Sequence, residues 1–275
     1  LARRVKGRRG LSSIPAAGGG DPGLLGRLRK RGVQRLSLRP TPQTTPRDLL
    51  SGIAAAAQAG AEVVALESLG PPLNREAFVK RAVTAGLGVA VLVPGGPPEA
   101  LAGAAAELGR ARVPWVLAVD PGDVEEVGFE VMRGHVERCR ALGASVLVMS
   151  CARALDAGAP LSEVAAGARE ALVSGAALGV DVAVYGVPFC HLAEHVDRLL
   201  PMPPVTALDA WGQAVDLVRM VQPPKCRSCA LSNHCPGLAE VALGSLGEGV
   251  LHPVAGRPNE ERPPTAFEAL LGATS

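Results

Sequence analysis

Three cysteines lie close together in the last quarter of the chain. Cys226, Cys229 and Cys235 stand at positions i, i+3 and i+9 of the run KCRSCALSNHC, which lies between a Pro-Pro pair and a Pro-Gly pair. A C-x-x-C turn lets two sulfur atoms face one ion, and thiolates are soft donors that suit iron–sulfur clusters and zinc. The spacing therefore predicts that these cysteines ligate a metal centre. We expect a [4Fe–4S] cluster, with zinc as the alternative.

Either kind of centre generally needs a fourth ligand. Cys190 is the best candidate, because it follows the last apolar strand-like run, from which the chain leads into the cysteine-rich segment. His191, His195 and His234 are alternatives; His234 is the weakest because neighbouring residues such as His234 and Cys235 rarely point at one metal. Four protein ligands leave no open metal position, so such a centre would be structural or electron-carrying.

The remaining cysteines, Cys139 and Cys151, lie in or beside apolar runs and are interpreted as buried small residues. No apolar segment follows the basic N-terminal residues, so we expect no export signal and no disulfide framework. No run of 18 apolar residues is present, the formal net charge is only +2, and five cations stand in the first ten residues. We interpret these cations as a solvated arm, with a tether to nucleic acid or anionic lipid as the alternative. We expect a cytoplasmic protein without a nucleic-acid or membrane partner.

Short apolar runs alternate with helical patterns from about residue 24 to residue 200. This alternation predicts α/β architecture with a parallel sheet, because strands covered by helices on both faces are short and continuously apolar. Periodicity alone does not separate an open sheet from a barrel. The predicted strands are 33–39, 62–66, 88–93, 115–119, 145–149 and 181–185, and the helices 46–58, 74–85, 99–108, 124–142 and 161–178.

Composition suggests four parts of the chain. Residues 1–23 form a flexible basic and Gly/Pro-rich lead-in, and residues 24–200 contain the six strand–helix units. Residues 201–255 form a metal-binding extension that contains the three clustered cysteines, and residues 256–275 form a polar, Pro-rich tail.

The segment Gly186-Val-Pro-Phe-Cys190, the C-x2-C-x5-C-Pro-Gly run and Leu251-His-Pro253 together resemble the C-terminal part of radical SAM proteins. The resemblance implies a partial (β/α)6 barrel with a short Cys-rich extension that holds an auxiliary four-iron cluster, similar to SPASM and twitch extensions. It also assigns the ligands Cys190, Cys226, Cys229 and Cys235 to that cluster. The SPASM pattern continues with a further cysteine at a position that is Ala239 here.

The chain departs from that family where its radical chemistry takes place. The stretch from Arg39 to Thr45 contains no cysteine, although the family's C-x3-C-x2-C loop belongs there, and no cysteine precedes Cys139. Glu67 begins a stretch that keeps only fragments of the family's Gly-Gly-Glu-Pro motif, so it is a weak candidate for binding the amine of S-adenosylmethionine. The resemblance therefore implies a degenerate relative that does not cleave S-adenosylmethionine.

Three functional hypotheses follow. The first is a non-catalytic or redox partner that binds a peptide or an active radical SAM enzyme and carries one [4Fe–4S] cluster. The second is an α/β scaffold with a structural zinc site. The third is a different enzyme that uses polar groups at strand ends, where active sites of parallel α/β folds collect; these groups are Glu67, Asp120, Ser150 and Asp156. Whether the chain is an enzyme stays open at this point.

Overall fold

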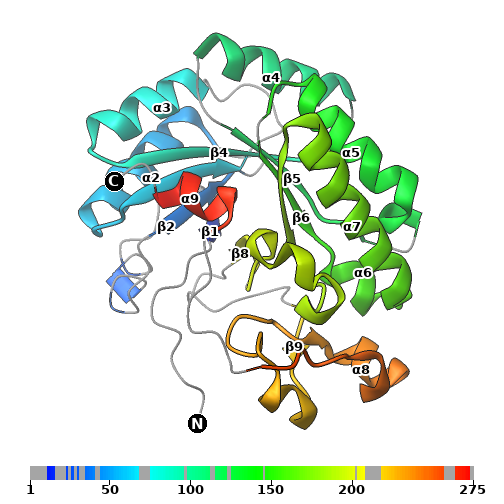
Figure 1. Ribbon diagram of the computed structural model, residues 1–275. Coiled ribbons are helices and arrows are strands. Elements are labelled where there is room, and N and C mark those ends of the chain that lie inside the picture. Colours follow the sequence, from blue (N-terminus) through cyan, green and yellow to red (C-terminus); the bar gives the residue numbers. More distant parts are fainter. Residues whose placement is uncertain are drawn as a thin grey trace. The chain divides into compact units, whose positions relative to one another are not determined.

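The computed structural model describes residues 11–15, 23, 26–27, 30, 35–40, 44–67, 75–95, 98–111, 115–122, 125–144, 146–201, 203–207, 218–256 and 264–272. The chain divides into two compact units (Figure 1). Unit 1 comprises residues 1–115, 205–217 and 268–275, and unit 2 comprises residues 116–204 and 218–267.

The described residues of unit 1 form five parallel strands. Helices connect β2, β3 and β4 in chain order. The strands lie in the order β8-β1-β2-β3-β4, with every described pair parallel. Their bounds are β1 (Leu11–Pro15), β2 (Arg35–Arg39), β3 (Val63–Glu67), β4 (Gly88–Pro94) and β8 (Val205–Ala207). The helices are α2 (Pro46–Gln58), α3 (Arg75–Thr84) and α4 (Pro98–Ala111). Parallel neighbours need such crossovers, because a tight turn can join only antiparallel strands.

Helix α2 begins where the sequence predicts. The Thr45 side chain accepts a hydrogen bond from the backbone of Asp48, and the Asp48 carboxylate accepts one from the backbone of Thr45. This reciprocal pair is a capping box, and Pro46 occupies the first helical position, where its missing N–H costs nothing. Ile53 of α2 and Phe78 of α3 are almost completely buried in one apolar cluster with Leu36, Leu38, Val64 and Leu66 of the strands.

Unit 2 is built on the parallel strands β5 (Trp115–Val119, within the unit from Val116), β6 (Val146–Ser150) and β7 (Asp181–Tyr185). The short turn η1 (Glu125–Val127) leads into α5 (Phe129–Ala141), and α6 (Ala152–Asp156) and α7 (Leu161–Leu178) connect β6 to β7. Helices α5 and α7 pack side by side (Figure 1). Helix α7 ends at Gly179, whose φ of 69° is the left-handed conformation that glycine adopts without strain.

The cysteine-rich part of unit 2 consists of short elements. After β7 come the 3-10 turns η2 (Phe189–His191) and η3 (Ala193–Arg198). The later segment contains β9 (Met220–Val221), η4 (Pro224–Ser228), β10 (Leu238–Ala239), α8 (Glu240–Leu246) and η5 (Glu248–Val250). Strands β9 and β10 pair antiparallel, which brings the start and the end of the three-cysteine run together. Helix α9 (Ala266–Gly272) follows near the end of the chain.

The α/β class is confirmed. The six predicted strands are divided between the two units, and their parallel pairing inside each unit is confirmed as well. The boundaries of the four predicted parts, the partial barrel and its Cys-rich extension stay predictions. Two local predictions are wrong. Residues 1–23 were expected to be a flexible lead-in, but Leu11–Pro15 form β1, since β2 offers them a paired edge. The single helix expected over 124–142 is divided at Gly128 into η1 and α5. None of the helices formed by the described residues is long and apolar enough to cross a membrane.

Gly167 of α7 is required by the close packing of unit 2. A Cβ atom built at Gly167 would lie 2.2 Å from the carbonyl oxygen of Val127 and 3.0 Å from the Cγ atom of Met132. By contrast, a Cβ atom at Gly134 of α5 would meet nothing within 4 Å. The absent side chain at Gly167 therefore sets how closely α7 approaches η1 and α5.

Substituting these two glycines by alanine should have opposite effects. We expect Gly167→Ala to lower the free energy of unfolding by about 1–3 kcal/mol, the usual cost of overpacking. Gly134→Ala should raise it by roughly 0.5–1 kcal/mol, because alanine favours the helix. Urea unfolding of the full chain, followed by circular dichroism, measures both. Equal effects at the two sites would show that the contact with Val127 does not constrain α7.

Candidate metal centre

One pocket of unit 2 is lined by all four predicted cysteine ligands. Cys190, Cys226, Cys229 and Cys235 contribute to its wall, although Cys190 is far from the others in sequence. Cys190 lies in η2, Cys226 in η4 and Cys229 directly after η4, and Cys235 ends the turn that precedes β10. The rest of the wall is Pro188, Gln222, Ser232, Gly237, Leu251 and Pro253.

Backbone N–H groups donate hydrogen bonds to the sulfur atoms. Cys235 Sγ accepts from the N–H of Phe189 at 3.3 Å and from the N–H of Gly237 at 3.4 Å. Cys229 Sγ accepts from the N–H of Val254 at 3.3 Å. Hydrogen bonds of this kind favour the thiolate, because they stabilise its negative charge. Phe189 directly precedes Cys190 in the chain, so its hydrogen bond also brings the segment with Cys190 against Cys235.

The strap, defined as residues 250–254, joins these separate segments. Its Val250 carbonyl oxygen lies 2.8 Å from Nε2 of His191, and its Leu251 carbonyl accepts a hydrogen bond from Lys225 Nζ at 2.8 Å. Ala230 donates its N–H to the Val254 carbonyl at 2.9 Å. The strap thus contacts both the segment with Cys190 and the loop with the other three cysteines. Without contributing a predicted ligand, it builds much of the site.

Gln222 and Gly237 support the loop that ends at Cys235. The side-chain amide of Gln222 donates to the carbonyl of Ser232 at 2.9 Å and to the carbonyl of Cys235 at 2.5 Å. Gly237 has a φ of 92°, and a Cβ atom there would lie 2.0 Å from the Val221 carbonyl oxygen. Only glycine combines this conformation with so close an approach of two backbones. Sequence reasoning missed Gln222 and the contacts of the strap, although Leu251-His-Pro253 and the Pro-Gly pair were both visible signals.

Burial dominates the electrostatics of the thiols. It raises the pKa of Cys190 and Cys226, and it raises the pKa of Cys235 to about 11. The other thiols of the pocket raise these pKa values further, whereas Lys225 lowers those of Cys190 and Cys226. A hydrogen bond with the backbone of His252 also lowers the pKa of Cys190.

The four thiols nevertheless lie on the wall of the pocket and do not meet at a point. Within the described residues, no group of three or more Cys, His, Asp or Glu side chains is arranged so that it could hold a metal ion. The expectation of a ready-made four-cysteine centre is therefore wrong for the geometry described. The physical reason is that the ligands come from separate turns, each fixed by its own backbone hydrogen bonds. The assignment of these cysteines as ligands stays a prediction.

The alternative histidine ligands lie in other contacts. His191 Nε2 is bound to the strap, and His195 Nε2 lies 4.0 Å from a carboxylate oxygen of Glu194. Among the described residues that line the pocket there is no histidine. Cys139 and Cys151 are fully buried, as predicted, and lie outside the lining.

The strand-end residues do not gather at this pocket. Glu67 is the last residue of β3 in unit 1, where its backbone pairs with Leu92; its side chain lies outside the described part of the structure. Asp120 follows β5 and forms an ion pair with Arg153 at 3.1 Å, and burial raises the pKa of Asp120. In the turn that follows Asp120, the Glu126 carboxylate accepts a hydrogen bond from the N–H of Gly122.

No protein-family model and no curated protein matches the sequence. Solved structures are similar at low scores. Citrate synthase SbnG has a TM-score of 0.41 at 14% identity and covers 67% of this chain and 81% of its own. Tryptophan synthase from M. tuberculosis has 0.42 at 14%, covering 72% and 81%. The HpcH/HpaI aldolase from Desulfitobacterium hafniense has 0.41 at 12%, covering 72% and 85%. Likeness of this degree carries no argument about activity.

These findings correct the family resemblance. The expected membership of the radical SAM superfamily with a SPASM or twitch-like segment is wrong, since the similar structures are of other enzymes and no family model matches. The function inferred from that membership, a degenerate radical SAM-like cluster protein, is wrong with it. Its two alternatives, a structural zinc scaffold and an enzyme at the strand ends, fit no better. The cysteine spacing alone was too short a pattern to establish a family.

The reactivity of the six thiols should divide them into two groups. Burial raises the pKa of both Cys139 and Cys151 to about 12, so only about one in ten thousand of these thiols is ionised at pH 8. We expect both to resist iodoacetamide at pH 8 in the folded chain, while the half-buried Cys226 is alkylated. Peptide mass spectrometry at several times measures this. Alkylation of Cys151 as fast as Cys226 would contradict the described packing.

Proposed function

We propose that unit 2 binds a metal centre through the thiolates of Cys190, Cys226, Cys229 and Cys235. The observation that carries the proposal is the shared pocket, which is lined by cysteines from two segments distant in sequence, one with Cys190 and one with the other three. Few other residues in its wall are of types that ligate metals. The proposal rests on this chain's own residues and on no relative.

The hydrogen bonds of the pocket support thiolate ligation. Three N–H···S hydrogen bonds, from Phe189, Gly237 and Val254, already point at two of the sulfurs. Outer-shell contacts of this kind orient ligands and tune the bound metal. Lys225 adds a positive charge beside Cys226 and Cys190 that would offset part of the negative charge of four thiolates.

Thiolate chemistry restricts the class of occupant. Four cysteines suit an iron–sulfur cluster or zinc, and much less well magnesium or calcium, which prefer oxygen ligands. A [4Fe–4S] cluster would place each thiolate on a different iron atom, and zinc would require all four to approach one ion. The experiment therefore offers the protein both occupants.

Metal analysis of the full chain tests the proposal. The protein is prepared anaerobically and incubated either with ferrous iron and sulfide or with zinc, and unbound metal is removed. We expect about one metal centre per chain. The protein treated with iron and sulfide should show the visible absorbance typical of iron–sulfur proteins, and the zinc-bound protein should be colourless. Replacing Cys226 or Cys229 by serine should reduce the bound metal at least about tenfold, because a ligand is lost.

Cys139→Ala provides the matched control. Cys139 is buried in α5 and lies outside the pocket lining, so the amount of bound metal should equal that of the unsubstituted chain. Circular dichroism shows whether each variant is folded. A folded chain that retains neither metal after both treatments would overturn the proposal, as would equal metal content in the Cys226→Ser and unsubstituted proteins.

A further inference from the structure

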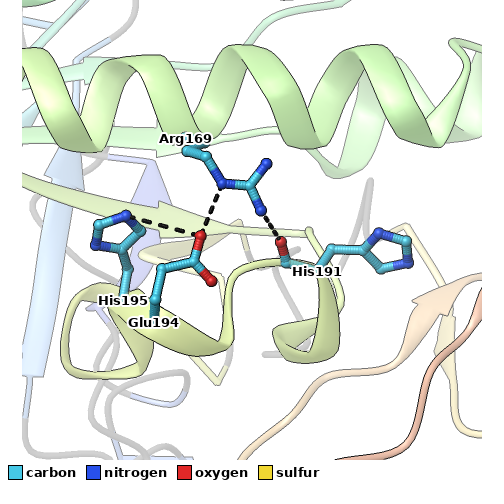
Figure 2. A network of polar contacts seen from close by, with 4 residues as sticks. All are labelled: Arg169, His191, Glu194 and His195. Carbon is cyan, nitrogen blue, oxygen red and sulfur yellow. Dashed lines mark hydrogen bonds and ion pairs between the residues drawn. The ribbon is translucent and has the colours of Figure 1, made fainter.

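Arg169 links helix α7 to the turn that contains Cys190. Its Nε atom lies 2.7 Å from Oε1 of Glu194, and its Nη2 atom donates to the carbonyl of His191 at 2.6 Å (Figure 2). The guanidinium thus uses two of its N–H groups on two residues of the η2–η3 segment. A planar guanidinium with donors at fixed angles is suited to hold two acceptors in one relative position.

The bond to His191 acts on the peptide that directly follows Cys190. The carbonyl of His191 faces Arg169, while its ring faces the strap through the Val250 carbonyl at 2.8 Å. Arg169 of α7 therefore holds the backbone of η2, and the strap holds the imidazole ring of His191. Phe189 completes the arrangement with its N–H on Cys235. Cys190 lies between these three attachments.

We infer that Arg169 and Glu194 position Cys190 as the fourth ligand of the pocket. This inference rests on the proposed function. The three clustered cysteines belong to one loop with its own hydrogen bonds, so their relative placement does not need Arg169. Cys190 comes from another segment, and its placement depends on contacts that lock η2 in place. Loss of the Arg169 contacts should leave three ligands in position and the fourth free to move.

The effect should be on the site and hardly on global stability. The side chains of Arg169 and Glu194 are 46% and 51% exposed, and ion pairs this exposed contribute little to folding. A second exposed pair in the same unit, Arg133 with Glu137 at 2.9 Å on α5, has exposures of 51% and 54%. Arg133 and Glu137 pair with each other within α5, away from the described cysteine segments in sequence, so Arg133 offers a matched control.

Cobalt binding tests the inference, because thiolate-to-cobalt charge-transfer absorbance grows with the number of thiolate ligands. The full chain and the variants Arg169→Gln, Arg169→Lys and Arg133→Gln are titrated anaerobically with Co²⁺. We expect Arg169→Gln to weaken Co²⁺ affinity by about 10- to 100-fold, as loss of an outer-shell contact does, and to reduce the charge-transfer absorbance. Arg169→Lys should recover part of both, since an ammonium can reach one of the two acceptors. Arg133→Gln should match the unsubstituted chain.

Alkylation of Cys190 gives an independent readout. With Co²⁺ present, iodoacetamide should modify Cys190 faster in Arg169→Gln than in the unsubstituted chain, while Cys229 stays protected in both. If Arg169→Gln does not fold, Glu194→Ala removes the charged partner and keeps the bond to His191; it should show a smaller change in the same direction.

The outcomes separate the two proposals. If the unsubstituted chain binds no Co²⁺ and retains neither the iron–sulfur cluster nor zinc, the proposed function fails; if it retains only the cluster, bound iron in the same variants replaces Co²⁺ as the readout. If it binds Co²⁺ and Arg169→Gln has the same affinity, spectrum and Cys190 protection, the inference fails while the proposed function stands. Unchanged values in Glu194→Ala overturn the inference when Arg169→Gln does not fold. Equal losses in Arg133→Gln and Arg169→Gln would also overturn it, because the effect would then be one of surface charge.

Discussion

Backbone N–H groups directed at sulfur atoms are the interaction on which the pocket of unit 2 depends. Two of the three bonds connect a cysteine to a distant stretch of chain: Cys235 to η2 through Phe189, and Cys229 to the strap through Val254. A side-chain contact could be lost by rotation, but a backbone donor moves only with its segment. The bonds therefore transmit the positions of η2 and the strap to the sulfurs, and the pocket exists only where all these segments are folded.

The same unit needs close backbone approaches to bring its segments together. Gly167 lets α7 approach η1, and Gly237 lets the end of the cysteine run lie against β9. Gly186, with a φ of 94°, lets the chain after β7 pass against Ala152 of α6 on its way to Cys190. At these positions a side chain would meet backbone atoms, which cannot move aside as a flexible side chain can. The packing of the α/β scaffold and the geometry of the pocket thus both require glycine where two backbone segments approach closely.

The sequence predicted elements well where one local signal dominated. Apolar runs marked β5 and β7, and the Thr45 cap marked the start of α2, because burial and capping act over few residues. It missed β1 and β8, whose pairing depends on a neighbour far along the chain and leaves no periodic pattern in three to five residues. The motif Leu251-His-Pro253 marked the strap in the sequence, but its contacts with η2 and the cysteine loop were missed for the same reason. Most of its contacts are made by backbone N–H and C=O groups, which are the same in every sequence and therefore leave no signal in the residue types.

For the candidate site, spacing indicated which cysteines stand together but not how closely. The C-x-x-C turn is local, whereas the approach of Cys190 depends on Arg169, His191 and the strap, which no spacing reveals. The resemblance to a family failed because a few short motifs were extended to a whole chain. Short cysteine spacings reflect what metals require of a loop, so unrelated proteins can share them.

Metal binding would resolve an electrostatic conflict in the pocket. Burial raises the pKa values of Cys190, Cys226 and Cys235, and neighbouring thiols of the pocket raise them further, so ionising these three thiols together is costly. Lys225 and the N–H donors offset only part of this cost. A cation of high charge supplies the rest, because ligation displaces the thiol protons and replaces mutual repulsion by attraction to one centre. The raised pKa values and the sulfur-directed hydrogen bonds are then complementary. The first favours the neutral thiols of Cys190, Cys226 and Cys235 in the absence of a metal, and the second would hold the sulfurs of Cys229 and Cys235 in place for ligation.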